Sequence, residues 1–168
     1  MTKTSNGSRR AGPGDPPRAS ADDVALERAL EGLFRLGANR RFDARQSAAV
    51  GAVVTRAGYA VLRSLADHEH LSLRQAADIC AMDAATASRQ LVPLVDQGLV
   101  QRQTSGDDAR SIELRLTTRG REVYDRIVDY RLAHLTSTLR DWPDADRRHL
   151  SDLVVRLVTD LTNEPLPR

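Results

Sequence analysis

The strongest constraint on the fold is a change in the spacing of apolar residues at Gly98. Before this glycine, Ser72 and Asp83 are each placed to cap a short helix, because their side chains accept hydrogen bonds from the free N–H groups of a first helical turn. After it, residues 112–116 alternate between apolar and polar side chains, which is typical of a strand. Two short helices followed by a β-hairpin predict a winged helix-turn-helix lobe.

Further helices are predicted on both sides of this lobe. Ser20-Ala21-Asp22-Asp23 has the pattern of a capping box and opens the first. Thr55 is a candidate cap for a second, and Thr117 or Thr118 opens a long third helix. Asp141-Trp142-Pro143-Asp144 separates that helix from the last one. The predicted fold is therefore mainly α, with a small β-hairpin wing and additional N- and C-terminal helices.

The outer helices carry apolar stripes that a winged lobe of this size cannot cover, so we expect a homodimer in which a second copy covers them. The expected organisation is a disordered arm over residues 1–19, an N-terminal dimerisation region over 20–54, a winged lobe over 55–117 and C-terminal dimerisation helices over 118–168. The arm is rich in Gly and Pro and has almost no large apolar side chains. The expected dimer contacts are Leu26, Leu30, Leu33, Leu150, Leu153, Val154, Leu157, Val158 and Leu161.

Charge is distributed unevenly along the 168 residues, whose formal net charge is +2. Residues 1–20 hold four basic side chains and one acidic side chain, a net of +3, so the remainder of the chain is net −1. A globally basic surface is thereby excluded, and any contact with phosphates must come from individual arginines. No apolar run approaches the roughly 18 to 20 residues that cross a bilayer, so we expect a cytoplasmic protein without a membrane partner.

The sequence offers no motif for catalysis. It has no Ser-His-Asp order, Gly-rich phosphate loop, HExxH or CxxC pattern, so we expect neither an enzyme nor a cofactor. His68-Glu69-His70 lacks a recognised spacing of metal ligands. Cys80 has no His or Lys near it in sequence, which favours a buried thiol over an oxidant sensor.

Between Tyr59 and Gly120 a set of short motifs follows in a fixed order. They are Val61-Leu62 with Leu65, Leu71-Ser72-Leu73, Ala76-Ala77, Asp83-Ala84-Ala85-Thr86-Ala87-Ser88-Arg89, Leu91-Val92, Gly98-Leu99-Val100 with Arg102, Asp108-Ala109-Arg110, and Leu116-Thr117 with Gly120. In this order and spacing the sequence resembles the MarR family of winged helix-turn-helix transcriptional regulators. It departs from the family at Val95, where an acidic residue is usual, and at Pro93, which predicts a kink between Arg89 and Pro93 in the recognition helix.

The resemblance implies a regulator, most simply a repressor, whose dimer places two recognition helices in successive turns of double-stranded DNA at a pseudo-palindromic operator. Arg89 is the candidate for a bidentate contact with guanine, and Thr86 or Ser88 for a phosphate or a thymine methyl. Asp108 is expected to orient Arg110 toward the minor groove. The full set of expected DNA contacts is Ser72, Arg74, Gln75, Ala85, Thr86, Ser88, Arg89, Gln90, Arg102, Asp108 and Arg110.

Two questions remain open at the level of sequence. A small aromatic effector of unknown identity is a candidate partner, and six aromatic residues either line its pocket or belong to the core: Phe34, Phe42, Tyr59, Tyr124, Tyr130 and Trp142. The alternative function is a dimeric winged-helix interaction protein that binds a protein or ligand without DNA. The net charge of −1 outside the arm and the proline in the recognition helix favour that alternative.

Overall fold

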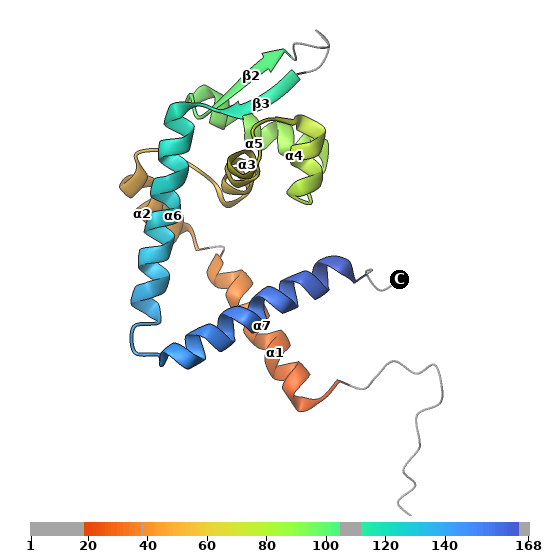
Figure 1. The fold of residues 1–168 in the computed structure, drawn as a ribbon, viewed down its shortest axis with the longest axis vertical. Coiled ribbons are helices and arrows are strands. Elements are labelled where there is room, and N and C mark those ends of the chain that lie inside the picture. The colour runs from red at the N-terminus through yellow and green to blue at the C-terminus, as the bar shows by residue number, and fades with distance from the viewer. Residues whose placement is uncertain (1–18, 38, 105–111, 165–168) are drawn as a thin grey trace, which may run out of the picture. The chain divides into compact units, whose positions relative to one another are not determined.

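The computed structural model describes residues 19–37, 39–104 and 112–164 (Figure 1). The arm predicted over residues 1–19 lies almost wholly outside them. Within these ranges the elements are α1 (Ala21–Gly37), α2 (Arg40–Val50), α3 (Arg56–Asp67), β1 (Leu71–Ser72), α4 (Leu73–Ile79), α5 (Ala84–Asp96), β2 (Val100–Thr104), β3 (Ile112–Leu116), α6 (Thr118–Thr138) and α7 (Asp144–Asn163). The chain divides into two compact units, residues 1–40 and 41–168. The predicted fold class, mainly α with a small wing, is confirmed.

The first unit contains α1, which begins where the capping box predicted. The Asp23 N–H donates to the Ser20 hydroxyl oxygen at 3.1 Å, and the Ser20 N–H donates to the Asp23 carboxylate at 2.7 Å. The Ser20 N–H, and after it the Ser20 hydroxyl, which also donates to the Asp23 carboxylate, lower the pKa of Asp23. Leu26 and Leu33 are exposed along the helix and Leu30 is half-buried.

The core of the second unit lies between α3, α5, α6 and a three-stranded antiparallel sheet. The strand order is β1-β3-β2, with Val100 opposite Leu116 and Leu71 opposite Leu114. Figure 1 shows β2 beside β3. The hairpin of β2 and β3 is the predicted wing. The two-residue strand β1 was not predicted, because so short a strand shows no periodicity. The least exposed large side chains are Leu62, Leu65, Leu91, Leu94, Leu99, Leu114 and Ile127.

The junction between the wing and α6 is unusually close. Thr117, rather than Thr118, caps α6: its hydroxyl accepts from the Gly120 N–H at 2.9 Å and donates to the Gly98 carbonyl at 2.7 Å. A Cβ added at Gly120 would lie 1.9 Å from the Leu99 carbonyl oxygen, so no larger residue fits there without movement of the backbone. The first turn of α6 is therefore fixed directly to the start of the wing.

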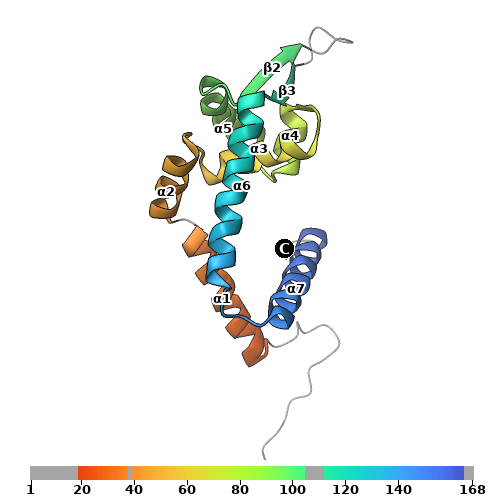
Figure 2. The same cartoon turned by 60° about the vertical axis from the view of Figure 1, so that its left-hand side comes forward.

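The sequence did not predict α2, which packs beside α6 (Figures 1 and 2). Gln46 of α2 is only 1% exposed, and its side-chain oxygen accepts a hydrogen bond from Arg131 Nε of α6 at 2.8 Å. The Arg131 guanidinium lies 3.7 Å from the centre of the Tyr59 ring, and Phe42 contacts Tyr130 with ring centres 5.7 Å apart. Burial lowers the pKa of Arg131 from its ordinary value. Polar and aromatic contacts, together with Val50 buried at the end of the helix, thus hold α2, which lacks a longer apolar stripe.

Several apolar side chains are more exposed than predicted. Ile79 was expected inside α4 but is 50% exposed, because the next residue ends this seven-residue helix. Leu132 and Leu135 of α6 are also exposed. In α7 the predicted stripe is largely exposed, and no residue of the helix is buried within the single chain. None of the helices in the described ranges has the length and apolar character required to span a bilayer.

Candidate nucleic-acid interface

Helices α4 and α5 form the predicted helix-turn-helix. The Gln75 N–H donates to the Ser72 hydroxyl at 3.2 Å, and the Ser72 N–H donates to the Gln75 side-chain oxygen at 2.8 Å. Ser72 and Gln75, both predicted DNA contacts, therefore form a capping box at the start of α4. The sequence predicted Ser72 as the cap but not the return contact from Gln75. Arg74, between them, is exposed. Ala81, in the turn to α5, has a positive φ of 50°, and Cys80 before it is half-buried.

The start of α5 carries a short chain of polar contacts. The Asp83 carboxylate accepts from the Thr86 N–H at 2.8 Å and from the Thr86 hydroxyl at 2.7 Å, and Arg89 Nη2 donates to the Thr86 hydroxyl oxygen at 2.9 Å. The Thr86 hydroxyl is the main cause of a lowered pKa of Asp83. Each of these residues lies three positions, or about one helical turn, after the one before it. The predicted cap, Asp83, and the predicted contacts Thr86 and Arg89 therefore form one row along the helix. The guanidinium of Arg89 is thereby held on the exposed side of the helix.

The remaining predicted contact residues of α5 differ in their surroundings. Ala85 is exposed and Ser88 is half-buried. The Gln90 side-chain oxygen accepts a hydrogen bond from the Thr55 hydroxyl at 2.8 Å, so this side chain points toward the start of α3 rather than joining the row of Asp83, Thr86 and Arg89. The helix continues without a break through Pro93 to Asp96.

The wing presents fewer free charges than its composition suggests. Arg102 is exposed on β2, whereas Asp108 and Arg110 lie outside the described residues. Arg115 faces Glu113 at 3.4 Å and Glu69 at 3.7 Å, so its charge is shared with neighbouring carboxylates. Of the strand arginines that the structure describes, Arg102 is thus the one placed to meet an outside partner.

The two histidines considered as metal ligands have different neighbours. His68 Nδ1 lies 2.8 Å from the Ser64 carbonyl oxygen, and His70 Nε2 lies 3.8 Å from the Glu113 carboxylate. Across the part of the chain that the structure describes, no cluster of three or more His, Cys, Asp or Glu side chains could hold a metal ion.

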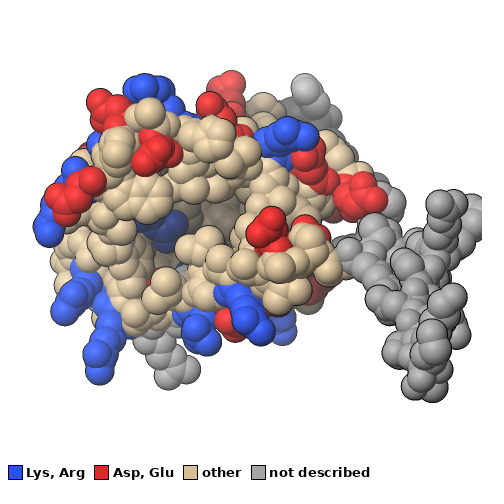
Figure 3. All heavy atoms as spheres, turned by 90° about the horizontal axis from the view of Figure 1, so that it is seen from below, with Lys and Arg blue, Asp and Glu red and all other residues tan. Residues whose placement is uncertain are grey.

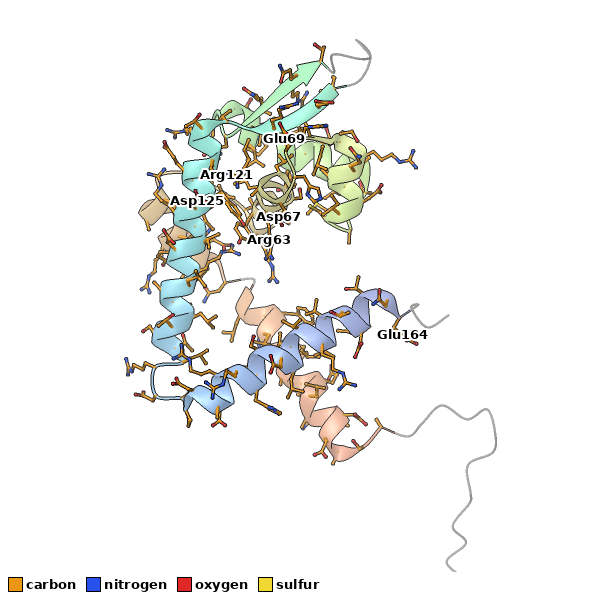
Figure 4. The ribbon with its side chains drawn as sticks, viewed as in Figure 1. Arg63, Asp67, Glu69, Arg121, Asp125 and Glu164 are labelled. Carbon is orange, nitrogen blue, oxygen red and sulfur yellow. The ribbon has the colours of Figure 1, made fainter. Side chains whose placement is uncertain are left out.

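A shallow cavity of about 420 Å³, which the sequence did not predict, lies between the end of α3 and the first turn of α6. Arg121 on its wall donates to the Ala66 carbonyl oxygen at 3.1 Å (Figure 4). The lining mixes cations, carboxylates and leucines, and this composition favours no single class of ligand. The lining residues are Leu65, His68, Glu69, Leu116, Thr117, Thr118, Arg121 and Glu122. On the face shown in Figure 3, basic and acidic side chains are likewise interspersed.

The fold and the exposed start of α5 define a winged helix-turn-helix protein. Residues 54–111 match the sequence model of the MarR family. A search of curated proteins finds no significant match.

Solved structures extend the likeness of fold beyond that segment. A MarR family protein from Bacillus stearothermophilus has a TM-score of 0.72 at 16% identity, over 86% of this chain and 99% of its own. A MarR transcriptional regulator from Methanosarcina mazei has a TM-score of 0.69 at 20% identity, over 84% and 99%. A MarR family transcriptional regulator from Silicibacter pomeroyi has a TM-score of 0.61 at 22% identity, over 86% and 94%. At these identities the likeness shows a common fold.

Proposed function

We propose that the protein is a cytoplasmic, sequence-specific DNA-binding transcriptional regulator that acts as a homodimeric repressor on a pseudo-palindromic operator. The observation that carries this proposal is the row of Asp83, Thr86 and Arg89 at the exposed start of α5 in a MarR-type winged helix. The start of such a helix is the part that reaches base edges in the major groove. A guanidinium already held in place there loses less conformational entropy on binding guanine than a free side chain would.

The other predicted residues surround this row in the proposed complex. Ala85 leaves space for the helix to approach the bases, and Thr86 or Ser88 meets a phosphate or a thymine methyl. Arg74, beside the capping box of Ser72 and Gln75, meets the backbone and fixes register without reading sequence. Arg102, with Asp108 and Arg110, is the proposed contact of the wing. Gln90, next to Arg89, is a further candidate contact, although its side-chain oxygen accepts from the Thr55 hydroxyl.

The proposed dimer uses the outer helices, residues 20–54 and 118–168, with the DNA-binding lobe over residues 55–117. Its support is the apolar stripe of α7, none of whose residues is classed as buried in the part of the chain that the structure describes, together with the exposed Leu26 and Leu33 of α1. Exposed apolar stripes of this kind are typical of surfaces that bind another chain. The two-fold axis of a dimer would present the two copies of α5 to half-sites about one helical turn apart.

A small aromatic effector is the proposed regulator of DNA release. Four of the six aromatic side chains considered for its pocket form two pairs on α2, α3 and α6: Phe42 with Tyr130, and Tyr59 with Tyr124. Phe34 and Trp142 are exposed. A ligand inserted among these rings releases DNA only if it binds one arrangement of the lobes more tightly than the other. Small phenols and aromatic acids are the compounds to test first.

The proposal is tested by footprinting the purified protein on its own upstream region and measuring affinity as a function of salt concentration. A sequence-specific binder protects a discrete site with two-fold character. Its affinity falls with log salt at a slope of about −0.9 for each phosphate contact. A dimer that protects no site and shows no salt-dependent binding supports instead the alternative, an interaction protein that binds a protein or ligand without DNA.

A further inference from the structure

Residues 51–55, called the strap here, connect α2 to α3 and run along the recognition helix. Their side chains alternate: Ala52 and Val54 are buried in the core, whereas Val53 and Thr55 are exposed. Thr55 also caps α3, since its hydroxyl accepts from the Gly58 N–H at 2.9 Å. The buried side chains of Ala52 and Val54 therefore anchor the strap in the core. The backbone N–H and carbonyl groups of Val53 point the other way and can bond to another element.

Gln97, at the end of α5, binds the strap through its side-chain amide. The Val53 N–H donates to Gln97 Oε1 at 2.9 Å, and Gln97 Nε2 donates to the Val53 carbonyl oxygen at 2.9 Å. The same Nε2 donates to the Pro93 carbonyl oxygen at 2.9 Å. One side chain thus pairs with both backbone groups of a residue 44 positions away and also closes the last turn of its own helix.

A second glutamine on the same edge of α5 repeats this contact. Gln90 lies two helical turns before Gln97, and residues at that spacing share one face of a helix. Its side-chain oxygen accepts from the Thr55 hydroxyl at 2.8 Å. Leu94 lies between the two glutamines and is 1% exposed. The strap is consequently held to α5 at two positions, Val53 and Thr55.

Pro93 explains why α5 needs an external support. Proline has no N–H, so the Arg89 carbonyl loses its helical partner, and the proline ring crowds that carbonyl. Arg89 is also the side chain proposed to read guanine. α5 therefore lacks one of the backbone hydrogen bonds that would hold the turn carrying Arg89. The Gln97 side chain adds a bond to the Pro93 carbonyl of the same helix and ties this helix to the strap at Val53.

We propose that Gln97 is a positioning residue for DNA recognition: by pairing with Val53 and with the Pro93 carbonyl, it sets the orientation in which α5 presents Arg89. This inference rests on the proposed function of α5 in binding DNA. Base contacts require side chains placed to within about 0.5 Å, whereas phosphate contacts tolerate larger displacement. Loss of the Gln97 pairing should therefore reduce discrimination between sequences more than it reduces affinity for DNA in general.

The test compares wild type with Gln97→Met, which keeps the length of the side chain and removes all three hydrogen bonds. The probes are a duplex enriched by the wild type from a randomised pool and a scrambled duplex of the same composition. Affinities are measured at a temperature at which both proteins are fully folded. We expect the ratio of the two affinities to fall about tenfold, as the loss of one to two net hydrogen bonds implies. The scrambled-duplex affinity and its salt slope should not change.

Hydrogen exchange of the Val53 amide provides a readout that does not involve DNA. It should accelerate in Gln97→Met and remain at the wild-type rate in Gln101→Met, the same chemical change at an exposed strand position. Gln101→Met should also keep the wild-type affinity ratio. If Gln97→Met does not fold, Gln97→Glu replaces it: it keeps an acceptor for Val53 but cannot donate to either carbonyl, and we expect a similar fall in the ratio.

The outcomes separate the inference from the proposed function. Faster exchange of Val53 with an unchanged affinity ratio means that Gln97 serves stability alone, and the inference is then wrong. Equal loss of affinity for both duplexes would overturn it as well. If the wild type enriches no duplex, the proposed DNA-binding function fails, and with it the role of Gln97 in recognition, while Val53 exchange still reports whether the strap is held.

Discussion

Gly120 shows how a single residue fixes the wing to α6. The position that a Cβ would occupy lies 1.9 Å from the carbonyl oxygen and 2.8 Å from the carbonyl carbon of Leu99, and both are backbone atoms that cannot rotate away. Gly120→Ala should therefore lower the free energy of unfolding by about 2 to 3 kcal/mol, despite the higher helix propensity of alanine. Urea denaturation measures the change. Arg119→Ala, at the exposed preceding position, is the matched control and should change stability by less than about 0.5 kcal/mol.

Asp83 should make stability depend on pH in the acid range. The Thr86 hydroxyl and N–H lower the pKa of its carboxyl below the ordinary value of about 3.9. A carboxyl whose pKa is lower in the folded protein contributes stability above its ordinary pKa and loses it as the pH falls through the folded-state pKa. The difference in unfolding free energy between wild type and Asp83→Asn should thus be constant near neutral pH and shrink below about pH 4. Asparagine still caps the helix. A difference that stays constant to pH 2 would contradict the assignment.

Helix caps were predictable at the residue scale, whereas the long-range polar contacts were not. Thr55, Asp83 and Thr117 each bond to an N–H three residues away, and so short a separation is visible in sequence. Gln97 and Arg131 bond to groups 44 and 85 positions away. Glutamine and arginine at such places look like ordinary surface residues until the fold brings their partners near.

At the scale of elements, the same limit explains why α2 was missed. Its sequence has one aromatic residue, no leucine or isoleucine and four arginines or acids in its first six positions, so no apolar stripe marks it as a packed helix. It is held instead by Arg131, whose guanidinium meets both the Tyr59 ring and the Gln46 side chain. The winged lobe has regular caps and periodicity, and its helices were predicted with nearly correct bounds.

Arg131→Met tests whether this arginine holds α2 against α6. The substitution keeps an apolar stem but removes the cation–π contact and the hydrogen bond to the buried Gln46, whose oxygen is then left without its donor. We expect a loss of about 2 kcal/mol in unfolding free energy. Amide exchange in α2 should accelerate more than exchange in α3. Arg126→Met, exposed on the same helix, controls for loss of charge. Equal acceleration in both helices would show only general destabilisation.

At the scale of the whole molecule, α7 connects the fold to the proposed function. Its apolar residues recur on one face over the full length of the helix, yet none of them is buried within the chain. The cost of exposing so many leucines and valines to water would be removed by a second copy, and a two-fold pair is the arrangement that a pseudo-palindromic operator requires. Dimerisation and DNA affinity should therefore be lost together.

Leu153→Asp makes this coupling measurable, because it places a charge on the apolar face of α7 without disturbing a buried contact. The variant should sediment at the monomer mass of 18.5 kDa while wild type sediments at twice that mass. Its operator affinity should fall by about 10² or more, since two half-sites no longer bind as a linked pair. Thr159→Asp adds the same charge on the opposite face of the helix and should remain dimeric. If wild type itself sediments as a monomer, or if the monomeric variant binds the operator as tightly as wild type does, α7 is not the dimer surface on which recognition depends.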